Sequence, residues 1–194
     1  MAPLLRLNWC ATCGGGRNFG DQLGPILLRH YGYHVMWASP ATCSVITVGS
    51  ILSKVPNGYR GTVLGTGFIR AGMRKDLSHA RVLAVRGHLT RRACKLPPRT
   101  PLGDLGLLVC DLPRPEMRKL GTVVIPHSVD HDIAARHPDA TVVPITSDPS
   151  RVIGAVAAAD LVISSSLHGI ITADALGVPR VLELHPGVLG GLFK

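Results

Sequence analysis

The fold is decided most clearly by residues 161–177, which read LVISSSLHGIITADALG. The apolar residues 161–163 predict a buried strand, and three serines follow where that strand ends. From about His168 to Leu176 the pattern predicts a helix, with Gly177 placed to end it. A short buried strand that runs into a polar turn and a helix is the repeating unit of a parallel α/β sheet.

The same alternation of short apolar runs and helical patterns continues through the rest of the chain. Predicted strands occupy residues 4–9, 34–37, 44–48, 62–64, 82–85, 122–125, 141–145 and 181–184. Predicted helices occupy residues 18–31, 89–96 and 148–159, with Asn18 as the N-cap of the first. Short strands that alternate with helices indicate parallel sheets covered on both faces.

The fold class that follows is α/β, with two Rossmann-like lobes that contain parallel sheets and face a cleft. Residues 114–120 lie between proline-rich turns and are interpreted as a linker, so we place the lobes at residues 1–118 and 119–194. The glycine-rich residues 187–194 show no helical pattern. We therefore expect the second lobe to be cut short.

The composition is that of a folded protein. Of 194 residues, 46% are hydrophobic and 17% are charged, which excludes a disordered chain. No apolar run reaches the ~20 residues of a membrane span, and residues 1–9 lack the apolar stretch of a signal peptide. We expect a cytoplasmic protein, peripheral at most to the inner face of the membrane.

The net charge of +9 admits nucleic acid, an anionic membrane surface or small anionic substrates as partners. The arginines are scattered and only 4% of residues are aromatic, whereas nucleic-acid binding favours clustered charge with aromatic side chains for stacking. We therefore expect no nucleic acid. A solvated basic surface accounts for most of these arginines.

Cysteine and histidine patterns suggest metal sites only weakly. Cys10 and Cys13 form one Cys-x-x-Cys pair, which fits a redox or zinc pair, but no second pair follows. His127, His131 and His137 are interpreted as solvated loop histidines. We expect no metal.

The carboxyl ends of the predicted strands carry glycines and polar side chains, and ligands of open parallel sheets bind there. Arg86 provides a planar cation for a carboxylate or phosphate. The serine turn Ser164–Ser166 before a helix suits an anion, and His168 suits proton transfer near neutral pH. Serines that cap the helix and a histidine that only packs explain the same stretch equally well. Asp21 also has two interpretations: its charge is favourable at the start of a helix, or its carboxylate binds a sugar hydroxyl.

Taken together, the strand-end motifs resemble the polysaccharide pyruvyl transferase family. The matching pieces, in the family's order, are Asn18–Asp21, Gly49-Ser50, Gly65–Gly67, Val85–Gly87 with Thr90, Gly103-Asp104, Ile125–His127 with Asp130, and Ser164–Gly169 followed by Ala173–Ala175 and Gly177–Pro179. Two departures are Leu105, where the family commonly has proline, and the family's continuation beyond the position of Lys194.

The resemblance implies a two-lobed fold similar to the GT-B glycosyltransferases. It also implies transfer of a pyruvyl group from phosphoenolpyruvate to two hydroxyls of a saccharide, which forms a cyclic ketal and releases phosphate in polysaccharide or exopolysaccharide biosynthesis. Phosphoenolpyruvate is then the donor substrate, and no cofactor is expected. The acceptor is a saccharide, with a lipid-linked one among the candidates, and the N-terminal lobe is the acceptor side.

That chemistry suggests a role for each candidate residue. His168 is the general acid and base, and Arg86 grips the donor. Asp21 and Asn18 face the acceptor. Substrate-binding positions complete the prediction: Gly20, Gly67, His127, Ser164, Ser165, Ser166 and Gly169.

Two other functions remain open at this point. A glycosyltransferase that uses a nucleotide sugar shares the two-lobe fold, and it needs an acidic residue for the donor ribose, for which Glu183 is the second-lobe candidate. A shortened, non-catalytic relative that only binds a saccharide is the other alternative.

Overall fold

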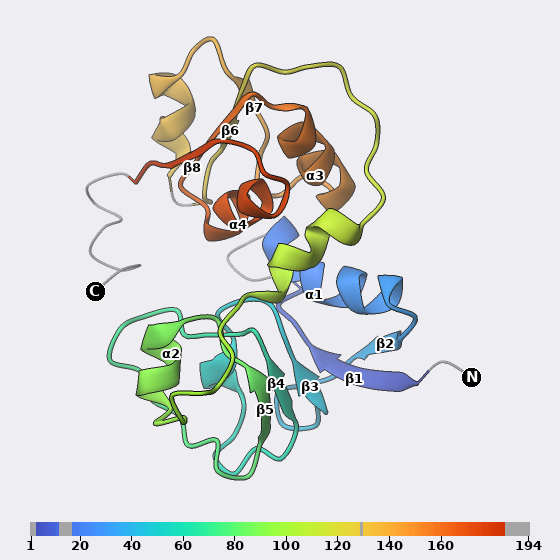
Figure 1. Cartoon of the computed structure of the whole chain (residues 1–194), viewed down its shortest axis with the longest axis vertical. Helices are drawn as coiled ribbons and strands as arrows, with labels where there is room; N and C mark the ends of the chain where they lie inside the picture. Colours follow the sequence, from blue (N-terminus) through green and yellow to red (C-terminus); the bar gives the residue numbers. More distant parts are fainter. Residues whose placement is uncertain (1–2, 12–16, 129, 185–194) are drawn as a thin grey trace. The chain divides into compact units, whose positions relative to one another are not determined.

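The computed structural model describes residues 3–11, 17–128 and 130–184, and these form two compact units. Within the described residues, unit 1 comprises 3–10 and 23–105. Unit 2 comprises 11, 17–22, 106–128 and 130–184. Each unit contains one parallel sheet with helices (Figure 1), so the predicted α/β fold with two parallel sheets is confirmed.

Unit 1 contains a five-stranded sheet with the order β2-β1-β3-β4-β5. The strands are β1 (Leu4–Asn8), β2 (His34–Trp37), β3 (Val45–Ile46), β4 (Thr62–Leu64) and β5 (Arg81–Ala84), and every pair is parallel. Helix α1 (Phe19–His30) connects β1 to β2, and α2 (His88–Ala93) follows β5. The order places β1, β3 and β4 inside the sheet, where Leu7, Val45, Ile46 and Val63 are buried.

The core of unit 1 forms where these short strands meet the segments that follow them. Ile46, Val63 and Val85 are fully buried and pack with Leu52 of the short 3-10 helix Leu52–Lys54. Transfer of such side chains out of water is the main favourable term in folding. The core therefore holds the carboxyl ends of β3, β4 and β5 together.

Unit 2 contains a four-stranded parallel sheet with the order β7-β6-β8-β9. The strands are β6 (Thr122–Ile125), β7 (Thr141–Val142), β8 (Leu161–Ser164) and β9 (Arg180–Leu182). Helices α3 (Pro149–Ala158) and α4 (Leu167–Ala175) flank β8 in the chain. β6 and β8 lie in the middle of this sheet, and their apolar side chains are almost entirely buried.

The start of α3 shows why the local sequence folds as predicted. Asp148 is the N-cap, and its carboxylate accepts a hydrogen bond of 2.9 Å from the backbone N–H of Ser150. Pro149 occupies the first helical position, where the missing N–H is not needed. Hydrogen bonds from the Ser150 hydroxyl, at 2.6 Å, and from the Ser150 backbone N–H lower the pKa of Asp148.

The linker predicted at residues 114–120 has no regular structure, yet it packs within unit 2. A Cβ on Gly154 of α3 would lie 2.6 Å from Cγ of Pro115, and the N–H of Leu120 donates to the carbonyl of Ala158 over 3.0 Å. Two predicted strands are also much shorter than expected: within residues 44–48 and 141–145 the strands are only Val45–Ile46 and Thr141–Val142. Pro144 limits the second, because proline cannot donate to a sheet ladder.

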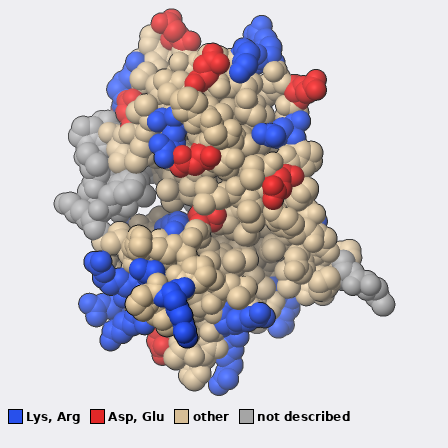
Figure 2. Space-filling view, in the orientation of Figure 1, with Lys and Arg blue, Asp and Glu red and all other residues tan. Residues whose placement is uncertain are grey.

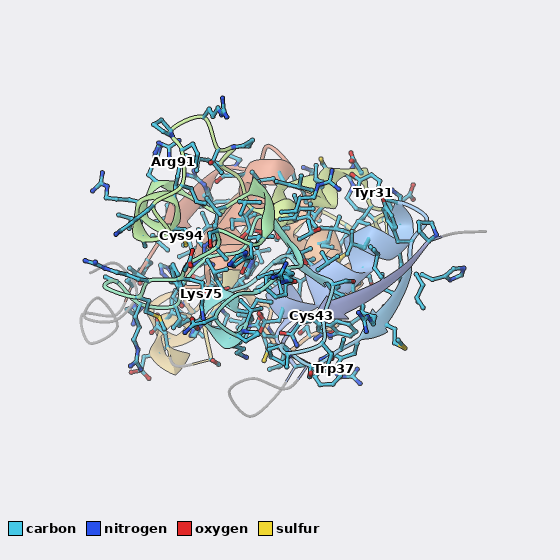
Figure 3. All side chains as sticks on the ribbon, turned by 90° about the horizontal axis from the view of Figure 1, so that it is seen from below. Tyr31, Trp37, Cys43, Lys75, Arg91 and Cys94 are labelled. Atoms are coloured by element: carbon cyan, nitrogen blue, oxygen red, sulfur yellow. The ribbon has the colours of Figure 1, made fainter. Side chains whose placement is uncertain are left out.

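Three 3-10 helices were not predicted: Leu52–Lys54, Leu105–Asp111 and His131–Arg136. Two buried thiols lie in unit 1, Cys43 and Cys94 (Figure 3). Burial raises the pKa of both, that of Cys94 to about 11, so they remain protonated near neutral pH. In the described part of the chain, no helix has the length and apolar character needed to cross a membrane.

Candidate functional site

The serine turn of unit 2 is a buried, hydrogen-bonded structure. Ser164 ends β8, and its hydroxyl donates to the carbonyl of Ile125 at the end of β6 over 2.8 Å. The same oxygen accepts from the backbone N–H of Ser166 over 2.9 Å. The Ser165 hydroxyl accepts from the backbone N–H of His127 over 2.9 Å. The ends of two adjacent strands are thus tied together, and all three serine side chains are buried.

His168 lies in the first turn of α4, directly after the serine turn, and is 8% exposed. Its ring packs against the backbone at the start of α1. A Cβ built on Gly20 would lie 2.2 Å from Nδ1 of His168 and 2.4 Å from its Cγ. Only a glycine leaves room for the ring at this distance. Gly20 and His168, which sequence analysis could only list separately, are in direct contact.

Gly169 has a similar role on the other side of the turn. A Cβ at position 169 would lie 2.4 Å from the Ser164 hydroxyl oxygen, which bonds Ile125. Glycines at 20 and 169 therefore allow close packing of α1 and of the serine turn against the start of α4. Both positions were predicted as substrate-binding, and the structure shows a packing reason for each.

Two hydrogen bonds fix the start of α1, one to the side chain of Asn18 and one between backbone groups. The side-chain oxygen Oδ1 of Asn18 accepts a hydrogen bond of 2.9 Å from the backbone N–H of Gly20, which confirms Asn18 as the capping residue. The N–H of Phe19 donates to the carbonyl of Ile145 over 2.9 Å. Asp21 is half-buried in the first turn of the helix, where a carboxylate is favourable.

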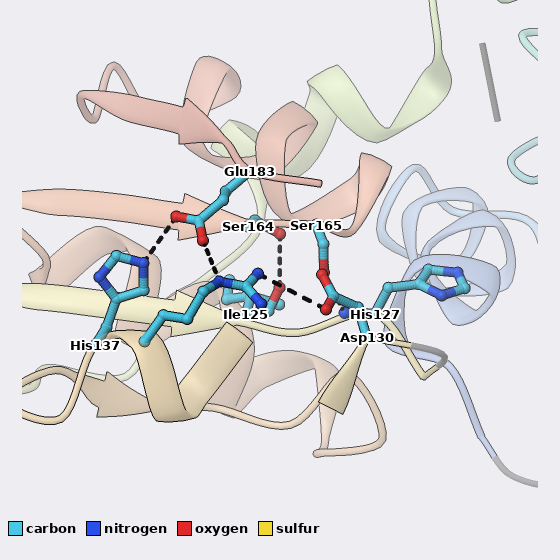
Figure 4. A network of polar contacts seen from close by, with 8 residues as sticks. Ile125, His127, Asp130, His137, Ser164, Ser165 and Glu183 are labelled. Atoms are coloured by element: carbon cyan, nitrogen blue, oxygen red, sulfur yellow. Dashed lines mark hydrogen bonds and ion pairs between the residues drawn. The ribbon is translucent and has the colours of Figure 1, made fainter. Parts of the chain in front are cut away.

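A network of charged side chains lies beside the serine turn (Figure 4). Glu183 accepts from Nε of Arg136 over 2.6 Å and lies 2.8 Å from Nε2 of His137. Arg136 also reaches the Asp130 carboxylate, with 3.8 Å between the nitrogen and the oxygen. The hydrogen bonds from Arg136 and from His137 lower the pKa of Glu183. Arg136 was not predicted as part of this network, because its position depends on the 3-10 helix His131–Arg136, which was not predicted either.

Asp130 is the most deeply buried carboxylate of this network, with 2% of its residue surface exposed. Neither of its oxygens has a hydrogen-bond donor among the described residues, and Arg136 is its ion-pair partner. Asp130 also acts on His127: burial lowers the pKa of His127, and the nearby Asp130 charge opposes that shift.

The prediction that His127, His131 and His137 are solvated loop histidines is wrong for two of the three. His127 and His137 are partly buried, and His137 contacts Glu183. His131 begins the 3-10 helix. Within the described residues, no group of three potential ligands is arranged to hold a metal ion. Cys10 is disulfide-bonded, so its sulfur is not a thiolate ligand, and Cys13 lies outside the described residues.

Arg86 is the centre of the corresponding region of unit 1. It follows β5, and its guanidinium donates to the Ser50 hydroxyl over 2.9 Å and to the carbonyl of Phe68 over 2.7 Å. A Cβ on Gly67 would lie 2.9 Å from the guanidinium and from the Thr90 hydroxyl. Gly67 is therefore a packing partner of Arg86, and sequence reasoning missed Ser50 as its acceptor.

The guanidinium of Arg86 is partly buried, and burial lowers its pKa. The buried Asp104 carboxylate opposes this shift through its charge. Two hydrogen bonds fix the plane of the group, while a guanidinium carries five N–H donors in total. The arrangement is a cation of fixed orientation at the end of a parallel strand, which is suited to a carboxylate or phosphate.

The predicted site residues are divided between the two units. Unit 2 holds Asn18, Gly20, Asp21, His127, Ser164–Ser166, His168 and Gly169. Unit 1 holds Gly67 and Arg86. His127, Ser164–Ser166, Gly67 and Arg86 lie at or just after the ends of parallel strands, which is the position of a ligand site in an open α/β sheet.

These features define an α/β protein with anion-suited strand ends in both of its units. A comparison with protein-family models is more specific: the model described as polysaccharide pyruvyl transferase matches residues 13–182. The chain belongs to the polysaccharide pyruvyl transferase family, which is a family of transferases. A search of curated proteins and a search of solved structures each found no match.

Proposed function

We propose that the protein transfers the pyruvyl group of phosphoenolpyruvate to two hydroxyls of a saccharide, forms a cyclic ketal and releases phosphate. The observation that carries this proposal is the buried His168 ring, held against Gly20 beside three buried serines. A histidine in such a position is suited to move a proton at a defined atom. Family membership supports the choice of this chemistry.

The reaction divides into two additions at the same carbon. A proton is added to the methylene carbon of the donor, which leaves an oxocarbenium-like centre at the carbon that bears the phosphate oxygen. One sugar hydroxyl attacks that centre and loses its proton, and the bond to phosphate breaks. A second hydroxyl then attacks the same carbon, loses its proton and closes the ketal ring. The sequence needs one group that acts as acid and then as base.

The roles follow from the chemistry of each side chain. His168 provides the proton and takes one back, and Arg86 binds the donor carboxylate or phosphate. Ser164, Ser165 and Ser166 with the amides that follow them bind phosphate at the start of α4, and His127 is a secondary donor contact. Asp21 and Asn18 hold the acceptor, although the Asn18 side chain also caps α1.

The charged network bears on the alternative of a nucleotide-sugar glycosyltransferase. That function needs a carboxylate available to the donor ribose, and Glu183 was the second-lobe candidate. The Glu183 oxygens already contact Arg136 and His137. This favours pyruvyl transfer over transfer from a nucleotide sugar.

We also propose a location and an acceptor class: the reaction takes place in the cytoplasm at the inner face of the membrane, on a lipid-linked saccharide. No metal or organic cofactor is assigned a step.

The test is release of phosphate from phosphoenolpyruvate with a panel of saccharide acceptors, together with the mass of the product. His168→Gln should reduce turnover by about 10²–10⁴-fold, because glutamine fills part of the space but cannot exchange the proton. The matched control is His79→Gln, since His79 is exposed and makes no hydrogen bond with a described residue. Full turnover in His168→Gln would reject the assignment, and binding of saccharide without any phosphate release would favour the non-catalytic alternative.

A further inference from the structure

The charges of the protein are divided very unequally between its two units. The described residues of unit 1 contain 13 Lys and Arg against two carboxylates, Asp76 and Asp104. Those of unit 2 contain seven Lys and Arg against ten carboxylates. The excess positive charge of the chain therefore belongs to unit 1. In Figure 2 the Lys and Arg side chains of the visible face gather over this unit, while red and blue are mixed over unit 2.

Within unit 1, much of this charge lies on two segments that pack together, residues 67–77 and 88–99. Gly67 lies against Thr90 of α2, since a Cβ at position 67 would lie 2.9 Å from the Thr90 hydroxyl. Phe68, Leu77, Cys94 and Leu96 share one hydrophobic cluster. Figure 3 shows Lys75, Arg91 and Cys94 on the same side of the unit. We call the exposed surface of these two segments the α2 surface.

Five lysine and arginine side chains of the α2 surface are exposed and form no ion pair with a described residue. They are Arg70, Arg74, Arg92, Lys95 and Arg99. One carboxylate lies on the same segments, Asp76, and it is occupied by hydrogen bonds from Ser78. The positive charge of this surface is therefore not neutralised by the protein itself.

Two apolar side chains accompany these charges. Leu89 on α2 is 69% exposed, and Ile69, which precedes Arg70, is 47% exposed. Exposed leucine and isoleucine among unpaired cations are typical of a surface that lies on an anionic bilayer, where cations meet lipid headgroups and apolar side chains enter the boundary of the acyl region. A soluble polyanion would use the cations alone.

Nucleic acid fits the same surface less well. Binding of single strands combines cations with aromatic side chains on which bases stack. The one aromatic residue of the two segments is Phe68, and it packs against the hydrophobic core of unit 1. The surface thus has the charge for nucleic acid but lacks the stacking side chains.

We infer that the α2 surface of unit 1 binds the surface of an anionic lipid membrane. The inference rests on the distribution of charge and of exposed apolar side chains, and it deepens the membrane-side location proposed above. It assigns to named residues a role that the pyruvyl transfer chemistry does not need. Such binding would bring the enzyme to the membrane where a lipid-linked acceptor is held.

The first test is co-sedimentation of the full chain with vesicles of phosphatidylcholine alone and of phosphatidylcholine mixed with phosphatidylglycerol. Binding should require phosphatidylglycerol and should weaken as salt shortens the Debye length from about 10 Å to about 3 Å. The double variant Arg92→Glu/Lys95→Glu should lower the partition coefficient at least about tenfold. Arg114→Glu/Arg118→Glu in unit 2 changes the net charge equally and should lower it less than about twofold.

The second test separates apolar contact from charge. Leu89→Ser should lower binding to mixed vesicles by about threefold, whereas Val181→Ser, at a comparably exposed apolar position of unit 2, should not change it. Equal binding to neutral vesicles would overturn the inference. So would equal losses in the two charge-reversal variants, or tighter binding to a single-stranded oligonucleotide than to mixed vesicles.

One readout distinguishes this inference from the proposed reaction. Phosphate release with a water-soluble saccharide acceptor should be the same in Arg92→Glu/Lys95→Glu as in the unaltered protein. Loss of vesicle binding with unchanged phosphate release supports both proposals. Vesicle binding by a protein that releases no phosphate supports the membrane surface and rejects the reaction.

Discussion

The ring of His168 lies against the backbone of Gly20, so close that a Cβ at position 20 would be 2.2 Å from Nδ1. The two residues come from different helices, α1 and α4, and are separated by about three quarters of the chain. The contact sets the position of the ring from one side, while the serine turn precedes it on the other. It converts two separate sequence motifs into one structural feature of unit 2.

Gly20→Ala should displace the His168 ring. A methyl group cannot fit at this distance, so the ring or the start of α1 must move, and we expect a loss of about 1–3 kcal/mol in the free energy of unfolding. Urea unfolding measures this loss, and the NMR signals of the His168 ring report its displacement. Gly103→Ala is the control, because a Cβ there meets no atom within 4 Å. Equal stability of both variants and an unchanged ring signal would contradict the contact.

Arg86→Lys should weaken donor binding more than a charge-conserving change normally does. Lysine keeps the positive charge but loses the fork that bonds Ser50 and the carbonyl of Phe68. If Arg86 binds the donor, we expect the KM for phosphoenolpyruvate to rise about tenfold or more. Arg81→Lys, on the exposed end of β5, is the control. A KM that is the same in both variants would leave Arg86 with a structural role alone.

Glu183 should make the stability of unit 2 depend on acid pH. Hydrogen bonds from Arg136 and His137 hold its pKa below the ordinary value of 4.5. A lowered folded-state pKa means that this stabilisation is present above pH 4.5 and is lost as the pH falls below that value toward the folded-state pKa. Glu183→Gln should therefore flatten the fall in the free energy of unfolding below pH 4.5.

The measurement is urea unfolding at a series of acid pH values. Glu116→Gln serves as the control, since Glu116 is exposed and has no ion pair with a described residue. Its pH dependence should match that of the unaltered protein. A slope in Glu183→Gln as steep as in the unaltered protein would show that the pair with Arg136 does not persist in solution.

Asp130→Asn should lower the pKa of His127 further. Burial already lowers it below the ordinary value of 6.5, and the Asp130 charge opposes that shift. Since the folded state resists protonation of His127, its contribution to stability is full above pH 6.5 and declines as the pH falls through the lowered pKa. NMR titration of the ring measures the shift. Asp132→Asn, a change at an exposed neighbour, should leave the pKa of His127 unchanged. An equal pKa shift in both variants would contradict the interaction between Asp130 and His127.

Much of the fold could be predicted from local sequence patterns. Strands β2 and β4 begin and end at the predicted residues. The N-cap Asn18 was visible because capping depends on a side chain and a backbone N–H two residues away. The 3-10 helix His131–Arg136 was missed, because its short turns carry no apolar periodicity. That omission is also why His137 was interpreted as a solvated side chain.

In the candidate site too, some features could be predicted from the sequence and others could not. The residue types at the strand ends were readable, since parallel strands place their polar turns at one edge of a sheet. Their partners were not readable. Arg86 bonds Ser50 and Phe68, and Arg136 meets Glu183, across sequence separations that no local pattern records.

The amino-acid sequence by itself determined the alternation of strands and helices and the chemistry at the strand ends, because both depend on side chains within a few positions of each other. Only the tertiary structure decided which of those groups touch. Sheet order brings Ser164 to Ile125 and β9 to β8, and close packing places Gly20 on His168. These contacts depend on the burial of whole faces of helices and sheets, which is a property of the assembled core and not of any one segment.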